Sequence, residues 1–166
     1  MIVRRKIDLT NYVCDEVANA VNGALLSLNG SLGQDMAAKF IDNLVENYNG
    51  SDWGNNGPRL ITRVLHEVCK TNQTSEMVKM KSCNGFRVVH YASCYPINGS
   101  SWHKLFNESF TEEAMNKIAK FNSTVVHFWN NLSKHHGKLL KSGKSAYLRL
   151  AKDYCPKVIA SSGDFF

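Results

Sequence analysis

NSTVVHFWNNLS, residues 122–133, is the stretch on which both the fold and the candidate site depend. Its first half holds three β-branched residues in a row, which favour a short buried strand. Its second half places a histidine, an indole and an amide at His127, Trp129 and Asn130. The pattern therefore predicts a strand from the core that ends in side chains able to meet a ligand.

The composition is that of a folded chain. The 166 residues are 43% hydrophobic and only 20% charged, which allows one domain with a real core and excludes disorder. No apolar run approaches the roughly 18 residues that a membrane span needs, and the opening MIVRRKIDL is too short and too charged for a secretion signal.

Asparagine is unusually often the first residue of an Asn-x-Ser/Thr sequon. The chain has seven such sequons, whereas its 17 Asn and 21 Ser and Thr would give about two by chance. This excess indicates a secretory or luminal protein, although an Asn-rich chain without glycans would show it as well. The sequons begin at Asn29, Asn49, Asn72, Asn98, Asn107, Asn122 and Asn131.

The five cysteines are consistent with a secretory or luminal protein. Cys69 and Cys83 enclose a polar loop, and a disulfide that closes a loop of this size contributes about 3 kcal/mol in the chain-entropy model. Cys14, Cys94 and Cys155 cannot all pair among themselves, so at least one thiol is left over. No cysteine spacing resembles a zinc site.

The net charge is +6, and much of it lies in KHHGKLLKSGKSAYLR, residues 134–149. A solvated basic face explains such a run, and attraction to a phosphorylated ligand is the second explanation. Nucleic acid is a weaker one, because aromatic residues are not interleaved with the basic ones. No nucleic-acid partner is expected.

Helical and strand patterns alternate along the chain without internal repeats, which predicts one compact α/β unit with short strands and packed helices. In the strand 21–28, Gly23 marks either a close approach by a ligand or backbone, or a bulge. Other expected elements are a strand at 86–91, a short helix near 102–106 and a helix at 144–153, and residues 71–85 are expected to be a polar loop.

Three further helix patterns have recognisable signals. Pro58 suits the first turn of a helix, and Thr111 can cap another. A third helix at 35–48 has one apolar stripe, made of Met36, Phe40, Ile41, Leu44, Val45 and Tyr48.

Several chemistries have no motif here: the chain has no Gly-rich phosphate loop, no GxSxG, no HExxH and no Asp-x-Asp. His127 could be a metal ligand when neutral, a phosphate donor when protonated, or a hydrogen-bonded core residue. Trp53 and Trp129 are either core aromatics or flat surfaces for sugar rings. The amides of Asn22, Asn56 and Asn130 can both donate to and accept from hydroxyls, so these residues indicate a hydroxyl-rich ligand.

Three segments, in order, resemble the α1,4-glycosyltransferase family, which includes lactosylceramide 4-alpha-galactosyltransferases and α4-N-acetylgalactosaminyltransferases. They are YNGSDWGNNGPRLITRV, then CYPINGSSWHKLF, then VVHFWNNLS followed by DYCP. VNGALLSL matches the family's Asn-Gly strand as well. The resemblance runs from about Leu9 to Pro156, nearly the whole chain.

This resemblance implies a type II Golgi membrane protein with a GT-A-like nucleotide-diphospho-sugar fold. Such enzymes use Mn²⁺ to move α-galactose or α-N-acetylgalactosamine, with retention, from UDP to a β-linked sugar of a glycosphingolipid. By position, His127 would contact the metal or diphosphate, Asn130 would serve catalysis and, with Trp129, shape the donor pocket, and Trp102 is an acceptor candidate. The sugar side would be lined by Asn22, Gly23, Trp53, Asn56, Gly57 and Pro58.

The chain also departs from the family pattern. The family's Asp-x-Asp would lie just before Met1, so residues 1–166 are expected to be the C-terminal part of a catalytic domain, inactive alone and poor at binding Mn²⁺. Membrane association would come only through an absent N-terminal anchor. Asn131 stands where the family usually has Lys, and Cys94 where it has an apolar residue. The alternatives are a catalytically silent luminal glycan-binding protein and a purely structural luminal domain.

Overall fold

The computed structural model describes residues 1–4, 11–16 and 19–165. Leu9, where the resemblance begins, lies outside the described residues. The chain divides into two compact units: a sheet unit, residues 8–91, and a helical unit, residues 1–7 and 92–166. The alternation of helices and strands predicts one compact unit instead. Local periodicity cannot tell which apolar stripes share a core, so the division is not visible in the sequence.

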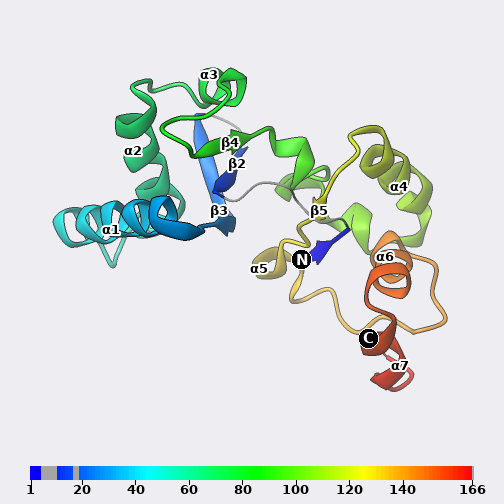
Figure 1. Ribbon diagram of the computed structural model, residues 1–166. Helices are drawn as coiled ribbons and strands as arrows, with labels where there is room; N and C mark the ends of the chain where they lie inside the picture. Colours follow the sequence, from blue (N-terminus) through cyan, green and yellow to red (C-terminus); the bar gives the residue numbers. More distant parts are fainter. Residues whose placement is uncertain (5–10, 17–18, 166) are drawn as a thin grey trace. The chain divides into compact units, whose positions relative to one another are not determined.

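The sheet unit holds a three-stranded sheet in the order β3-β2-β4 (Figure 1). Strand β2 pairs antiparallel with β3 and parallel with β4. Three helices lie between β3 and β4 in the chain. The elements are β2 (Tyr12–Glu16), β3 (Ala20–Ser27), α1 (Gly30–Asn47), α2 (Pro58–Cys69), α3 (Thr74–Lys79) and β4 (Arg87–Val89).

Helix α2 is the central packing element of the sheet unit. Pro58 occupies its first turn as expected, and its apolar side, with Leu65 fully buried, packs into one cluster with Val13 and Val21 of the sheet. The left-handed residue Lys70 ends the helix. The apolar spacing of a helix with a clear start signal is enough to predict its buried face.

The disulfide between Cys69 and Cys83 forms as the loop length suggested. The loop between these cysteines is not wholly irregular, however. Residues 74–79 form α3, whose Met77 is buried in the same core. The prediction of a polar loop at 71–85 is therefore wrong for this part, because one buried methionine anchors a helix too short to show a period.

The apolar stripe of α1 is only half buried. Met36 and Phe40 lie in the core, whereas Ile41, Val45 and Tyr48 are exposed. A stripe can be read from spacing, but its buried width depends on how much of it a neighbouring element covers.

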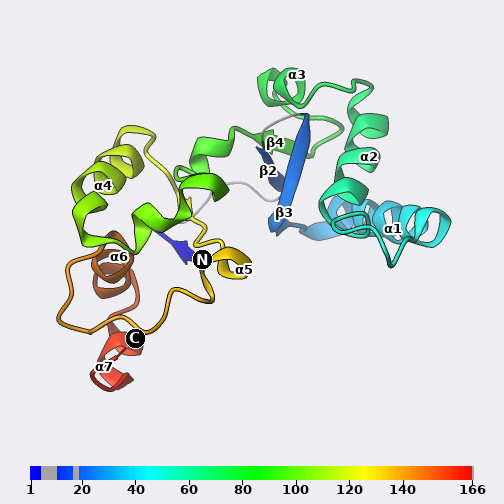
Figure 2. The ribbon, with the colours of Figure 1, turned by 180° about the vertical axis from the view of Figure 1, so that it is seen from behind.

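The helical unit has a two-stranded antiparallel ladder, β1 with β5. Its short helices are seen from behind in Figure 2. Strand β5 is buried, as the opening stretch predicts, but contains only two residues. The elements of the unit are β1 (Ile2–Val3), η2 (Gly99–Leu105), η3 (Glu108–Phe110), α4 (Thr111–Lys120), β5 (Val125–Val126), α5 (Asn130–Ser133), α6 (Ala146–Tyr154) and α7 (Pro156–Ser161), with η1 (Tyr91–Ser93) between the two units in the chain.

The helix starts in this unit agree only in part with expectation. Phe110, not Thr111, is the N-cap of α4, and the Thr111 hydroxyl instead donates to the carbonyl of Lys144 at 3.1 Å. Helix α6 begins close to the expected position, with the Ser145 hydroxyl accepting from the Leu148 amide. A further helix, α7, opens directly at Pro156, because proline suits the first turn of a new helix as well as the end of the preceding one.

Within the described residues, none of the helices combines the length and the apolar character that a bilayer span requires.

Candidate functional site

The end of β5 has an unusual backbone that positions its polar side chains. Trp129 has φ 52°, a left-handed conformation, and serves as the N-cap of α5. Its indole N–H donates to the carbonyl of Ile97 at 2.8 Å, and its ring lies against Gly99. This hydrogen bond and contact hold the turn that a non-glycine residue otherwise adopts at a cost.

His127 forms a cluster with two aromatic rings, which also contact each other. Its ring centroid is 4.7 Å from that of Trp129 and 5.7 Å from that of Tyr95. Burial lowers the pKa of His127, and the positive charge of the Met1 amino group lowers it further. The neutral imidazole is therefore favoured, and a neutral ring nitrogen can accept a hydrogen bond or bind a metal, whereas the protonated phosphate donor is disfavoured.

This shift predicts how stability depends on pH. The unfolded chain takes up the proton near the ordinary pKa of 6.5, whereas folded His127 takes it up only at lower pH, so stability should fall as pH drops below 6.5 toward the folded-state pKa. Melting temperatures measured between neutral and mildly acidic pH test this. His127→Gln should flatten the pH profile, and exposed His135→Gln should leave it unchanged; equal profiles for His127→Gln and the wild type would refute the assignment.

A pocket of about 350 Å³ opens in the helical unit beside this segment. Stacked rings form part of its wall, with Phe106 and Tyr147 centroids 5.0 Å apart and Phe128 edge-on to Tyr147 at 4.7 Å. Asn130 is one of its polar lining residues, but His127 is not among them. The full lining is Met1, Phe106, Phe128, Asn130, Ser133, Lys134, His136, Gly137, Leu139 and Tyr147.

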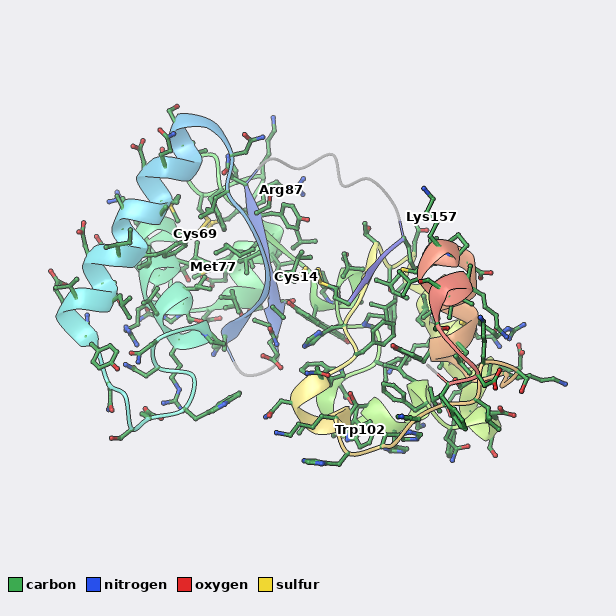
Figure 3. All side chains as sticks on the ribbon, turned by 90° about the horizontal axis from the view of Figure 1, so that it is seen from below. Cys14, Cys69, Met77, Arg87, Trp102 and Lys157 are labelled. Atoms are coloured by element: carbon green, nitrogen blue, oxygen red, sulfur yellow. A yellow bond between two sulfur atoms is a disulfide. The ribbon has the colours of Figure 1, made fainter. Side chains whose placement is uncertain are left out.

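Trp102 lies behind this wall. Its ring contacts two lining residues edge-on, Phe106 at 5.8 Å and His136 at 6.1 Å. Figure 3 shows it in the helical unit beside α5. Trp102 is not one of the lining residues, and it supports the pocket through its contacts with these two rings.

In the sheet unit, Asn22 and Gly23 lie where the β2–β3 pairing shifts register. Val13 pairs with Leu26 but Cys14 with Asn22, so residues 23–25 form the bulge that was one of the two interpretations of Gly23. A Cβ atom on Gly23 would lie 3.2 Å from Ile61 Cδ1 and 3.8 Å from the Pro58 ring, so side chains of α2 pack against this glycine. The approach of a ligand to Gly23 stays a prediction.

The Asn22 amide is occupied inside this bulge. Its nitrogen donates to Glu16 at 3.0 Å and its oxygen accepts from the Ala24 amide at 2.8 Å. The structure thus gives Asn22 a role in shaping the bulge, while its predicted contact with a sugar stays a prediction.

The loop at residues 49–58 is held by its own side chains. The Asn56 amide group accepts from the Asn49 N–H at 3.0 Å and donates to the Asn49 carbonyl at 3.0 Å. Gly57 is the N-cap of α2, directly before Pro58. Trp53, in contrast, is 82% exposed, so it is not a core aromatic. The loop presents an exposed indole surface on a firmly bonded frame.

Within each unit, the structure brings some of the predicted site residues together. Gly23 meets Pro58 in the sheet unit, and His127 meets Trp129 in the helical unit, where Asn130 lines the pocket. The remaining pocket residues were missed. Phe106, His136 and Tyr147 are far apart in the chain and share no motif, so only their packing could identify them.

Asp15 is another residue that sequence reasoning missed. Its side chain is 8% exposed, and its Oδ1 has no hydrogen-bond partner among the described residues. Burial raises the pKa of Asp15, opposed by the positive charge of His90 and a hydrogen bond from the Tyr91 backbone. Its neighbours Cys14 and Glu16 gave no hint of this, because a buried carboxyl in a strand has no sequence signal.

A divalent metal would need several ligands. Among the residues that the structure describes, no three His, Cys, Asp or Glu side chains lie together as a metal site would require. His127 can supply one neutral nitrogen, but the described residues do not by themselves make a Mn²⁺ site.

A family model described as the alpha 1,4-glycosyltransferase conserved region matches residues 30–162. A mouse lactosylceramide 4-alpha-galactosyltransferase is 30% identical over 94% of this chain, which covers 41% of that relative. A human alpha-1,4-N-acetylglucosaminyltransferase is 28% identical over 70% of this chain and 33% of the relative. No solved structure matches the chain.

The chain thus spans about two fifths or less of the length of these two relatives. The family match nevertheless covers elements of both units, from the start of α1 to beyond the end of α7. The mixed α/β architecture with small sheets and packed helices agrees with the expected class. On this evidence, the chain belongs to the alpha 1,4-glycosyltransferase family.

Proposed function

We propose that this chain contributes to a retaining glycosyltransferase that moves α-galactose or α-N-acetylgalactosamine from a UDP donor to a β-linked sugar of a glycosphingolipid. The family match and a relative named for lactosylceramide support this proposal. We further propose that the protein works in the Golgi lumen and that its units belong to a GT-A-like nucleotide-sugar fold. The seven sequons are consistent with a luminal protein.

The pocket beside the end of β5 is the observation that carries the proposal. Aromatic rings line part of it, as they do in many sugar-binding pockets, and Asn130 can donate to and accept from hydroxyls. His127, whose pKa is lowered by burial and whose ring lies against Trp129, directly follows the strand that leads to Asn130. The arrangement suits a ligand that combines hydroxyl groups with an apolar ring face.

The reaction requires that negative charge on the departing UDP be stabilised while an oxocarbenium-like sugar forms. Lys134 lines the pocket and supplies a positive charge there. The helical unit has 13 Lys and Arg against 5 Asp and Glu, a net +8 that attracts a diphosphate. A bound Mn²⁺ would add Lewis acidity at the diphosphate, but the described residues alone do not provide its site.

The direct test uses the enzyme to which this chain is proposed to contribute, and follows release of UDP from UDP-galactose and UDP-N-acetylgalactosamine, with Mn²⁺ and a soluble β-lactoside acceptor. Asn130→Ala should slow transfer about 5- to 150-fold, the equivalent of about 1 to 3 kcal/mol, because a sugar hydroxyl loses its partner. His127→Ala should slow it as well, and exposed His135→Ala is the matched control.

Transfer that is indifferent to both His127→Ala and Asn130→Ala would remove this pocket from the mechanism. Binding of UDP without any turnover in the wild type would instead support the silent glycan-binding alternative. Saturation-transfer NMR with UDP and with lactoside separates binding from transfer.

A further inference from the structure

The asparagines that open the seven sequons all lie at the surface. Each of the seven is exposed, whereas only five of the ten asparagines outside sequons are. In an Asn-rich chain whose sequons arise by chance, sequon asparagines should be buried as often as the others. Their uniform exposure therefore favours the other explanation of the sequon excess, which is that glycans are attached to the chain.

An N-linked glycan occupies one particular atom of the asparagine side chain. The sugar is bonded to Nδ2, whereas Oδ1 stays available as a hydrogen-bond acceptor. A folded chain can thus carry a glycan where the fold needs the amide oxygen but not the amide nitrogen. Several asparagines outside sequons fail this condition, because their Nδ2 donates to another group of the fold: Asn11, Asn22, Asn47, Asn55 and Asn56.

Two sequon asparagines use the amide in the opposite way. The Oδ1 of Asn49 accepts from the backbone amides of Ser51 at 2.9 Å and Asp52 at 3.2 Å. The Oδ1 of Asn107 accepts from the backbone amide of Ser109 at 2.9 Å. A backbone N–H can only donate, so the side-chain atom that it meets is the oxygen, and Nδ2 is the atom left over.

These two turns are local. In both, a donating N–H belongs to the serine that completes the same sequon, Ser51 or Ser109. Side-chain turns of this kind need only residues close in the chain, so they can form before the tertiary structure does. This matters because a glycan is attached while the chain enters the lumen. The same bond can then be kept in the folded protein.

Asn98 is held in a similar way at the start of η2. As the N-cap, its Oδ1 accepts from the Ser101 backbone amide at 3.1 Å and from the Ser100 hydroxyl at 3.0 Å. In the part of the chain that the structure describes, no hydrogen bond uses the Nδ2 of Asn49, Asn98 or Asn107. A sugar on that nitrogen would leave the bonds of the oxygen intact.

From these bonds we propose that Asn49, Asn98 and Asn107 are attachment sites for N-linked oligosaccharides. In the attachment, Nδ2 loses a proton and bonds to C1 of the first sugar of a lipid-linked oligosaccharide diphosphate. The bond from C1 to the diphosphate breaks, and the lipid diphosphate leaves. That donor is met in the secretory pathway, so attachment rests on the luminal location that is part of the proposed function.

The test maps glycans on the chain secreted from eukaryotic cells behind a cleavable leader. Only secreted protein is used, because misfolded chains are retained in the cell. Enzymatic release of N-glycans in heavy-oxygen water converts each glycosylated asparagine to an isotopically labelled aspartate, which mass spectrometry of peptides locates. The label should appear at Asn49, Asn98 and Asn107. The protein isolated from its natural source is mapped in the same way.

Serine variants show which sequon carries each glycan. Ser51→Ala, Ser100→Ala and Ser109→Ala each destroy one sequon but keep the asparagine and the backbone N–H that its oxygen binds. Each should lose one glycan, seen as one step in gel mobility. Ser101→Ala is the matched control, because Ser101 completes no sequon and its backbone N–H remains. It should keep every glycan.

A further variant separates the glycan from the hydrogen bond. Asn107→Gln removes both the glycan and the short side chain whose oxygen accepts from Ser109, whereas Ser109→Ala removes only the glycan. Asn107→Gln should therefore melt at a lower temperature than Ser109→Ala. Equal melting temperatures would show that the oxygen of Asn107 is not needed by the fold, which removes the physical basis of that site.

A secreted chain without label at one of the three asparagines would overturn the inference for that site, whichever other sequons are used. Serine variants with the mobility of the wild type would do the same. Label on the secreted chain but not on the protein from its natural source would refute the luminal part of the proposed function and leave the sites competent. Label on both, without sugar transfer, would refute only the proposed transferase activity.

Discussion

Replacing Cys69 and Cys83 together by alanine should lower the free energy of unfolding by about 3 kcal/mol. The disulfide closes a loop with a sequence separation of 14, which restricts the unfolded chain. It also ties the end of α2 to the segment that leads into β4, and Figure 3 shows Cys69 in the same core as Met77. Helix α3 lies within the closed loop and is otherwise held by the burial of Thr74 and Met77.

Urea unfolding followed by far-UV circular dichroism measures this loss. Cys155→Ala is the matched control, because Cys155 is a free cysteine and only partly buried. It should cost about 1 kcal/mol or less. If the double variant and this control unfolded at the same urea concentration, the disulfide would contribute nothing to the stability of the sheet unit.

Replacing Trp129 by alanine should destabilise the helical unit by about 2 to 4 kcal/mol and abolish measurable sugar transfer. The change removes the hydrogen bond to Ile97 and the ring contacts with His127 and Gly99. The left-handed backbone at this position would lose the contacts that offset its strain. Asn130 follows directly, so its place in the pocket depends on this turn.

Two variants separate the causes. Trp129→Phe keeps an aromatic ring but loses the indole N–H, and should cost about 1 kcal/mol. Trp53→Ala removes an indole that is 82% exposed and should change the free energy of unfolding by no more than about 0.5 kcal/mol. Thermal unfolding and the UDP-release assay are the measurements. A Trp129→Ala protein as stable and active as the wild type would contradict the role of this turn.

Local signals predicted those parts of the fold that depend on local interactions. Pro58 and the spacing of apolar residues after it determine α2, and the β-branched run determines β5. The loop length between Cys69 and Cys83 made their disulfide predictable. In each case, the physical cause lies within about 15 residues of sequence.

The errors have a common cause. Thr111 has the right side chain for a cap, yet its hydroxyl bonds to Lys144, which is 33 residues away. The spacing on α1 predicts one apolar stripe, but Ile41 and Val45 of that stripe are exposed. Helix α3 depends on the burial of Met77. All three outcomes depend on partners that are remote in the chain.

The candidate site also depends partly on local chemistry and partly on contacts between remote residues. The amides of Asn22 and Asn56 have the chemistry for sugar recognition, but tertiary contacts commit them to a bulge and a loop. Phe106 and Tyr147 became site candidates only when folding stacked them beside Asn130.

The amino-acid sequence by itself determined the family, the main helices, the disulfide and the polar end of β5, because motif order, periodicity and loop length are properties of the chain. Only the tertiary structure decided that the chain forms two units and that aromatic rings form part of a pocket lined by Asn130. It also decided that Leu140 meets Phe165 at the surface. Contacts between distant residues are selected by the packing of whole elements, and no local pattern encodes them.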